Sequence, residues 1–195
     1  MRDLYVPDGT VILSLPKPDA SWLMRFVSSQ IQDVTGSPYV HAEIVLGRAG
    51  TEVQVFESTV WAHDIRIWSG IRYNVGRVVE PGCLLLIPKV EYPIEKIALM
   101  GKFAEKYINR RVRYNFFKLL MLKFFYKKGN GVKHIPFQNN FFGMVCSVFI
   151  AEMNLYAGYR VCLKSKEYCA PGDLRNPAFY REVNVLEETR LIPRG

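Results

Sequence analysis

The first half of the chain alternates short apolar runs with turn residues, which is the pattern of β-strands. Residues 8–15 (DGTVILSL) begin with a turn and continue as a strand, and two further strand-like runs lie at 40–46 and 52–58. The five residues between those two runs, GRAGT, contain two glycines, so the pair is predicted to form a β-hairpin. The remaining candidate strands of this half are 63–68, 73–79 and 83–88.

A helix is predicted between the first two strands, where the apolar spacing becomes helical. Asp19 is a suitable N-cap for this helix, and Gly36 suits its end. The apolar residues at helical spacing, which we expect on one face, are Trp22, Phe26, Val27 and Ile31.

The pattern becomes predominantly helical after Pro93, which suits the first turn of a helix with apolar residues at 94, 97, 98 and 104. A second helix, rich in aromatic residues, is predicted over 114–128, and a third carries Cys146. From about residue 170 the chain reads as loop and short strands. Strands followed by helices, without βαβ alternation, predict an α+β fold with a mostly antiparallel sheet. The 195 residues fit a single domain over 1–195.

The chain is basic, with a net charge of +8 and a pI near 9.4, so it suits an anionic partner. Nucleic acid, anionic lipid and an anionic cell-wall polymer all meet that description. The basic residues are dispersed, and no helix-turn-helix or RNA-binding motif is visible, which argues against nucleic acid. His63 and His134 have no partners at metal-ligand spacing, so we interpret both as surface or loop residues.

The four cysteines do not form a CxxC pair, which argues against a zinc site. The chain begins without a basic region followed by an apolar core, so no secretory signal is predicted. The default expectation is therefore a cytoplasmic protein with free thiols, although Cys162 and Cys169 could pair in an oxidising compartment. A delivered or phage-associated protein fits the same observations. No apolar run is long enough to predict a transmembrane helix.

His41 lies near the start of the first hairpin strand, beside the predicted core. If residues 47–51 form the loop, Leu46 faces Glu52, and in the same register His41 directly faces Glu57. Opposed side chains in an antiparallel pair share a face, so the Glu57 carboxylate could orient the imidazole and stabilise its charged form. Glu43 lies two residues along on the same face and is the alternative partner. We prefer Glu57 because a directly opposed residue points at the ring more easily.

Cys146 follows FFG and opens the apolar segment MVCSVFIAEM, so it is predicted at the start of a helix. Helix N-termini carry partial positive charge and free amides, which favour a thiolate and can bind an oxyanion. A neighbouring His41 would complete a thiolate–imidazolium pair, the usual form of an activated cysteine nucleophile. A small buried apolar residue is the structural alternative for Cys146. Sequence spacing alone does not bring the two residues together.

Three segments together, VHAEIVLG, VQVFEST and MVCSVFIAEM, resemble the permuted branch of the NlpC-type papain-like superfamily, in particular YiiX-type proteins. That branch runs histidine, acidic or polar residue, then cysteine, the order found here. DGTVILSL, RYNFF and CAPGDL resemble further family segments, so the likeness spans most of residues 8–176. The resemblance implies a circularly permuted papain-like α+β domain in which an antiparallel sheet packs against helices.

The resemblance also assigns roles. It implies Cys146 as nucleophile, His41 as general base and then general acid, and Glu57 as the residue that orients His41. Tyr114 would contribute to the oxyanion site or to substrate positioning, and CAPGDL would form part of the pocket wall through Pro171 and Asp173.

Glu43 departs from the family pattern, which often has glycine or another small residue there. A carboxylate at this position would raise the pKa of His41, select cationic substrates, or turn away from the site. We therefore also name Glu43 as a weak substrate-site candidate, beside Tyr114.

The expected function is thiol-dependent hydrolysis of an amide or ester, without a metal or organic cofactor. The substrate is either a peptide of cell-wall type or an acylated lipid. Lysines among the aromatic residues of 116–126 suit peripheral contact with a membrane, although a core helix with snorkelling lysines is the favoured interpretation of that segment. A catalytically inactive binding module on the same scaffold is the alternative. Nothing in the sequence indicates an oligomeric state.

Overall fold

The structure is a computed structural model that describes residues 1–18, 22–63, 66–111, 146–162 and 169–194. Its helices and strands, in chain order, are β1 (Arg2–Val6), β2 (Val11–Ser14), α1 (Trp22–Thr35), β3 (His41–Ala49), β4 (Glu52–His63), β5 (Arg66–Val75), β6 (Arg77–Val79), β7 (Leu84–Pro88), α2 (Ile94–Asn109), α4 (Cys146–Tyr156), the 3₁₀ helix η3 (Pro171–Leu174), β8 (Tyr180–Asn184) and β9 (Thr189–Pro193).

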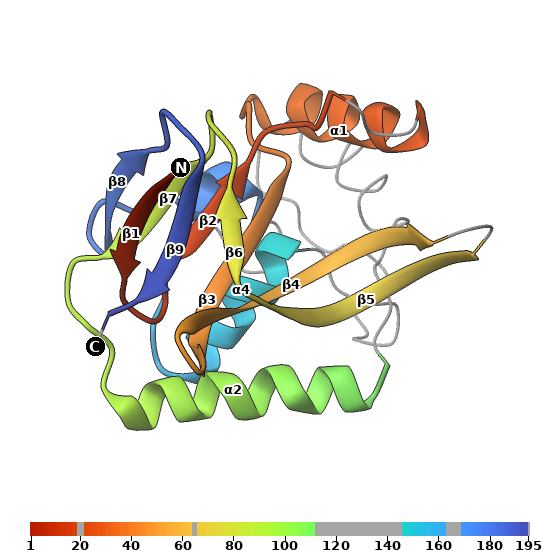
Figure 1. The fold of residues 1–195 in the computed structure, drawn as a ribbon. Coiled ribbons are helices and arrows are strands. Elements are labelled where there is room, and N and C mark those ends of the chain that lie inside the picture. The colour runs from red at the N-terminus through yellow and green to blue at the C-terminus, as the bar shows by residue number, and fades with distance from the viewer. Residues whose placement is uncertain (19–21, 64–65, 112–145, 163–168, 195) are drawn as a thin grey trace.

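Two sheets form the framework of the molecule (Figure 1). The larger sheet has the strand order β5-β4-β3-β2-β7-β8, and every neighbouring pair in it is antiparallel. The smaller sheet has the order β1-β9-β6, in which β1 and β9 are parallel. The described part of the chain is thus a mixed α+β structure with mostly antiparallel sheets, as the sequence predicts.

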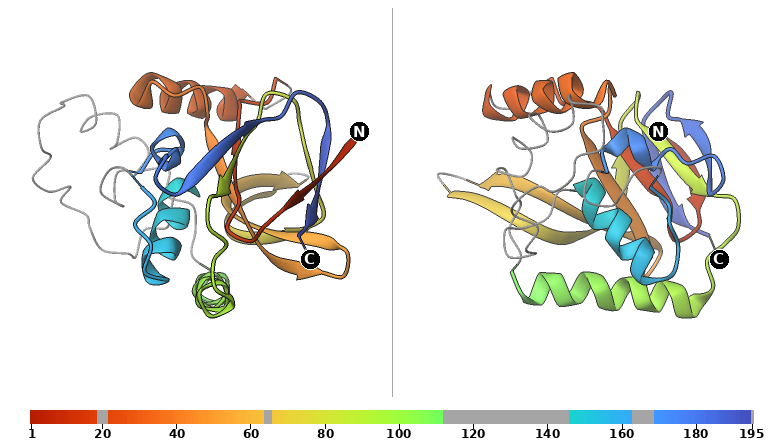
Figure 2. Two further views of the ribbon diagram at one scale, coloured as in Figure 1. Left: turned by 90° about the vertical axis from the view of Figure 1, so that its left-hand side faces the viewer. Right: turned by 180° about the vertical axis from the view of Figure 1, so that it is seen from behind.

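The larger sheet is covered on both faces, which explains its apolar strands. One face packs against α2 and α4, with Leu13 and Ile44 beside Phe149. The opposite face packs toward the smaller sheet, with Ile12 beside Leu191. The left view of Figure 2 shows α4 and the smaller sheet on opposite sides of the larger one. Alternate residues of β2 and β7 therefore enter different cores, and both strands read as continuous apolar runs.

Helix α1 forms where the sequence predicts it, but two aromatic residues expected on its buried face are exposed. Ile31 is buried as expected, whereas Trp22 is 74% exposed and Phe26 is 52% exposed. Apolar periodicity gives the helical spacing but not which side meets the core, and these two aromatics lie on the solvent side. The proposed cap Asp19 lies outside the residues that the structure describes. Gly36 follows the helix with a positive φ of 64°.

The β3–β4 hairpin is present, but its predicted register is wrong by two residues. Glu43, not His41, faces Glu57, and the strands continue to Ala49 and Glu52. The predicted five-residue loop is a two-residue connection with an irregularity between Val45 and Arg48. A displacement of two residues preserves the face on which each side chain lies, because the side-chain period of a strand is two.

The prediction of one strand over 73–79 is also wrong. The chain bends at Gly76, which has a φ of 70°, and residues on either side belong to different sheets. The N-terminal strand β1 carries no clear alternation and was not predicted. The short elements after residue 170 match the expected loop and short strands. The predicted helix over 114–128, including the proposed membrane-contact segment 116–126, lies outside the described residues.

Cys162 and Cys169 form a disulfide, so the expectation of free thiols is wrong for this pair. Cys83 and Cys146 are free and buried. Within the described part of the chain, no helix has both the length and the apolar character needed to cross a membrane.

Candidate functional site

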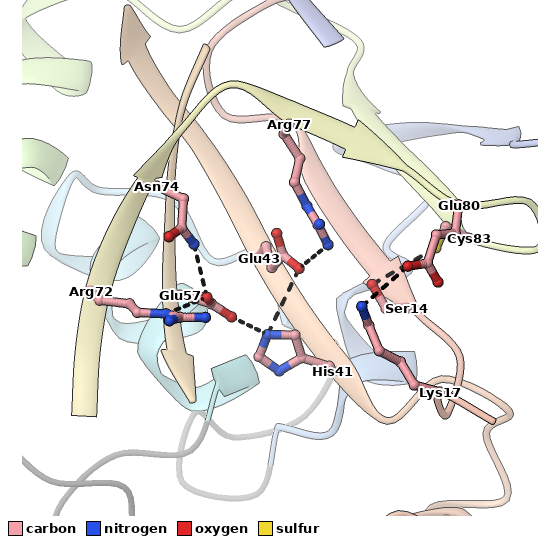
Figure 3. Close-up of polar contacts among 10 residues, drawn as sticks. All are labelled: Ser14, Lys17, His41, Glu43, Glu57, Arg72, Asn74, Arg77, Glu80 and Cys83. Atoms are coloured by element: carbon pink, nitrogen blue, oxygen red, sulfur yellow. Dashed lines mark hydrogen bonds and ion pairs between the residues drawn. The ribbon is translucent and has the colours of Figure 1, made fainter. Parts of the chain in front are cut away.

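A group of polar side chains gathers at the start of β3, on the face of the larger sheet that looks toward the smaller one (Figure 3). We call it the His41 cluster. Strands β3, β4, β5 and β6 supply its members, which are His41, Glu43, Glu57, Arg72, Asn74 and Arg77.

His41 contacts Glu57 directly. The distance between His41 Nε2 and Glu57 Oε2 is 2.7 Å, whereas Glu43 Oε1 lies 4.0 Å from the same nitrogen. The preference for Glu57 as the partner therefore holds, but the reason given for it does not. Glu57 reaches the ring diagonally across the hairpin, while the directly opposed position belongs to Glu43.

Glu57 is held by two further donors on β5. Arg72, its register partner, donates from Nε to Glu57 Oε1 over 2.7 Å, and Asn74 donates from Nδ2 to the same oxygen over 3.0 Å. Burial alone raises the pKa of this carboxyl, but the hydrogen bond and charge of His41, followed by Arg72, outweigh it and lower the pKa to about 2. Glu57 is therefore a fixed, ionised partner of the histidine.

Glu43 has a different partner, which comes from the smaller sheet. Arg77 on β6 donates from a terminal guanidinium nitrogen to Glu43 Oε1 over 2.6 Å. Burial lowers the pKa of Arg77, but the charge and hydrogen bond of Glu43 outweigh that effect and raise it. The Nε atom of Arg77 is buried and has no hydrogen-bond partner among the described residues. Glu43 is thus turned toward Arg77, although its charge still acts on the imidazole.

Cys146 is the first described residue of α4, directly after the undescribed residues 112–145, and its thiol lies close enough to His41 to act on the pKa of the ring. Burial by itself lowers the pKa of His41, because it disfavours the charged ring. The hydrogen bond and charge of Cys146 raise that pKa, and Glu57 and Glu43 act in the same direction. The balance places the pKa of His41 well above its ordinary value of 6.5.

The contact with Glu57 uses one side of the His41 ring. Glu57 takes Nε2, which leaves Nδ1 for another partner. His41 is the first residue of β3 and pairs with Ser14, the last residue of β2. Cys146 is only 1% exposed, and His41 retains 22% of its side-chain surface.

The start of α4 is tied to the segment around Cys169. Ser147 donates from its hydroxyl to the carbonyl oxygen of Cys169 over 2.5 Å. Pro171 begins η3, and Asp173 accepts a hydrogen bond from the backbone amide of Ala170. Pro171 and Asp173 thus help to shape the segment that packs against α4.

The sequence did not single out Arg72, Asn74 or Arg77. The first two alternate with apolar residues along β5 and share the face of Glu57, a signal that becomes useful only once the β4–β5 register is known. Arg77 belongs to another sheet, and its contact with Glu43 follows from tertiary packing alone. Tyr114 lies outside the residues that the structure describes.

No protein-family model matches the sequence, and no curated protein matches it. Among solved structures, the crystal structure of metalloprotein YiiX (DUF1105) from Escherichia coli O157:H7 is similar to this chain, with a TM-score of 0.60. The alignment has 13% sequence identity and covers 94% of this chain and 99% of the other. The protein therefore has a YiiX-type fold.

The name of that neighbour raises the question of a metal ion here. One ligand atom each from His41, Glu43 and Glu57 lie within 4.8 Å of one another, close enough for a single ion. The same two carboxylates, however, already bind the guanidinium groups of Arg72 and Arg77. At an effective dielectric constant of 20, two like unit charges 4 Å apart repel by about 4 kcal/mol. In this arrangement the residues therefore do not fit a divalent ion.

Proposed function

We propose that this protein is a cysteine hydrolase that cleaves an amide or ester bond through an acyl-enzyme on Cys146. The observation that carries the proposal is the bond from Glu57 to His41, together with the effect of the Cys146 thiol on the pKa of that histidine. A carboxylate that orients a histidine, which in turn contacts a thiol, is the arrangement that activates a cysteine nucleophile. The order histidine, acid, cysteine along the chain also fits a circularly permuted papain-like domain over 1–195.

Under this proposal each step falls to a named group. Glu57 fixes the imidazole through Nε2, and Nδ1 accepts the proton of the Cys146 thiol. The sulfur attacks the substrate carbonyl carbon, and backbone amides near Cys146 stabilise the resulting oxyanion. The imidazolium then donates its proton to the leaving amine or alcohol, which leaves a thioester. His41 next removes a proton from water, the hydroxyl attacks the thioester, and Cys146 is released.

The raised pKa of His41 supports this division of roles. An imidazolium that stays charged near neutral pH stabilises a neighbouring thiolate, and it holds the proton that the leaving group needs. Arg72 and Asn74 act as positioning residues, because both bind Glu57 Oε1 and leave Oε2 directed at His41. The substrate is either a peptide amide of cell-wall type or an acylated lipid.

One observation favours a second candidate, an inactive binding module on the same scaffold. Cys146 is 1% exposed, and a nucleophile must meet its substrate. A small buried residue at the start of an apolar helix would look the same.

Thiol reactivity separates the two candidates. The intact protein is treated with iodoacetamide from pH 5 to 9, and the modified cysteines are located by mass spectrometry. Cys83 is an internal control, because it is a second free, buried thiol. For a hydrolase we expect Cys146 to react faster than Cys83 below pH 7, since an ordinary thiol has a pKa near 8.5.

His41→Ala supplies the matched comparison. The low-pH advantage of Cys146 disappears in this variant if the imidazolium supports the thiolate. Equal labelling of Cys146 with and without His41, or an inert Cys146 in both proteins, would contradict the hydrolase and favour the binding module. A panel of acyl esters and peptide amides then distinguishes the two substrate classes, with Cys146→Ala as the blank.

A further inference from the structure

We infer that Arg77 holds Glu43 away from His41 and, with Arg72, takes the place that a divalent cation would occupy among His41, Glu43 and Glu57. The cluster then works as a network in which each carboxylate is offset by an arginine, so that metal ions are excluded. This inference concerns ion binding and stands whether or not Cys146 is catalytic.

Glu43 lies where it could compete with Glu57 for His41. It faces Glu57 directly across the hairpin, and its Oε1 lies 4.0 Å from His41 Nε2. Two carboxylates on opposed positions repel each other, and both would be drawn to the same imidazole. Arg77 binds Glu43 Oε1 over 2.6 Å and so gives this carboxylate a partner of its own.

Arg77 is not placed there by ideal packing. Its Nε atom is buried without a partner among the described residues, and an unsatisfied buried donor is destabilising. A neutral side chain of similar length would avoid that penalty. Arg77 does, however, form the ion pair with Glu43, which a neutral side chain could not form.

The charges within the His41 cluster also disfavour a cation. Two guanidinium groups offset the two carboxylates, so the cluster carries no excess negative charge to attract a cation, and a charged His41 makes it positive. Glu57 Oε1 accepts from both Arg72 and Asn74, and Oε2 contacts His41, so both of its oxygens are engaged. A divalent ion would have to displace an arginine or share its oxygen.

Removal of Arg77 changes this balance. Glu43 loses its partner, the cluster loses one positive charge, and Arg72 alone is left to offset two carboxylates whose oxygens lie, with a nitrogen of His41, within 4.8 Å of one another. Arg77→Met should therefore turn the cluster into a cation site. Mn²⁺ is the suitable probe, because it prefers carboxylate ligands to the nearby thiol.

The experiment is a titration of the folded protein with Mn²⁺ at neutral pH, followed by the loss of the EPR signal of free Mn²⁺. We expect wild type to show no site specific to this cluster, and Arg77→Met to bind one ion at least tenfold more tightly than wild type. Adding Glu43→Gln to Arg77→Met should abolish the gain. Arg77→Lys, which restores the positive charge, should largely exclude the ion again.

Arg175→Met is the matched control, because Arg175 also pairs with a glutamate but lies on the surface. It should leave Mn²⁺ affinity unchanged. Circular dichroism checks that each variant is folded, and Arg77→Gln replaces Arg77→Met if the latter is not. Tight one-to-one binding to wild type that Glu43→Gln removes would overturn the inference. So would a folded Arg77 variant with no gain in affinity.

Discussion

The same pair of residue types, arginine and glutamate, occurs in two settings in this protein. On the surface, Arg175 binds Glu182 through two hydrogen bonds of 2.8 and 2.7 Å, yet both side chains remain more than one-third exposed. In the His41 cluster, Arg72 donates from Nε over 2.7 Å to Glu57, whose side chain is only 6% exposed.

The surface pair has the better geometry, but loss of the buried pair has the greater effect on the free energy of unfolding. Water screens exposed charges and solvates either partner when the other is lost, so exposed pairs contribute little to stability. A buried carboxylate that loses its donors keeps its desolvation penalty. Solvent exposure, rather than bond length, therefore decides how much each of these ion pairs contributes to stability.

The largest expected effect comes from Glu57→Gln. The amide keeps the shape of the side chain but cannot stabilise the imidazolium. On a substrate found by the screen, we expect kcat/KM to fall by about 10²- to 10⁴-fold, or roughly 3–5 kcal/mol of transition-state stabilisation. The measurement is steady-state kinetics with Glu182→Gln as control. Equal activity of the two variants would remove Glu57 from the mechanism.

The next effect is a dependence of stability on pH. Because folding lowers the pKa of Glu57 from 4.5 to about 2, this carboxylate stabilises the protein above pH 4.5, and the stabilisation is lost as pH falls toward 2. The difference corresponds to roughly 3 kcal/mol. Urea unfolding from pH 7 to 3 should show wild type losing its advantage over Glu57→Gln across this range. A constant difference at every pH would contradict the lowered pKa.

The smallest effect tests the two settings side by side. Arg72→Met should lower the free energy of unfolding by about 2 kcal/mol, less than for a fully buried pair because the Arg72 side chain is 37% exposed. Arg175→Met should lower it by no more than about 1 kcal/mol. Both values come from urea denaturation at pH 7. A larger loss for Arg175→Met than for Arg72→Met would reverse the comparison.

The contact between His41 and Glu57 could be predicted from the sequence despite a wrong register. The displacement of the hairpin by two residues left both side chains on one face, so the diagonal contact replaced the direct one. The helix that carries Cys146 was also predictable, because its sequence is a nearly continuous apolar run. Local pattern was sufficient in both cases.

The arginines could not be predicted, because their contacts depend on long-range packing. Arg72 meets Glu57 only through the β4–β5 register, and Arg77 reaches Glu43 from a different sheet. The exposure of Trp22 has the same origin, since the helical period does not say which side faces the core. Sequence periodicity shows which residues share a face of one helix or strand, whereas the contacts of Arg72 and Arg77 depend on how strands pair and how the two sheets pack.

The bond between Ser147 and Cys169 bears on how this protein should be handled at the bench. Cysteine hydrolases are routinely stored with a reducing agent to protect the nucleophile. Here the same reagent would also open the disulfide between Cys162 and Cys169, and the carbonyl of Cys169 holds Ser147, the neighbour of Cys146. Preparations kept with and without reductant are therefore different samples, and labelling or activity measured in one should be repeated in the other.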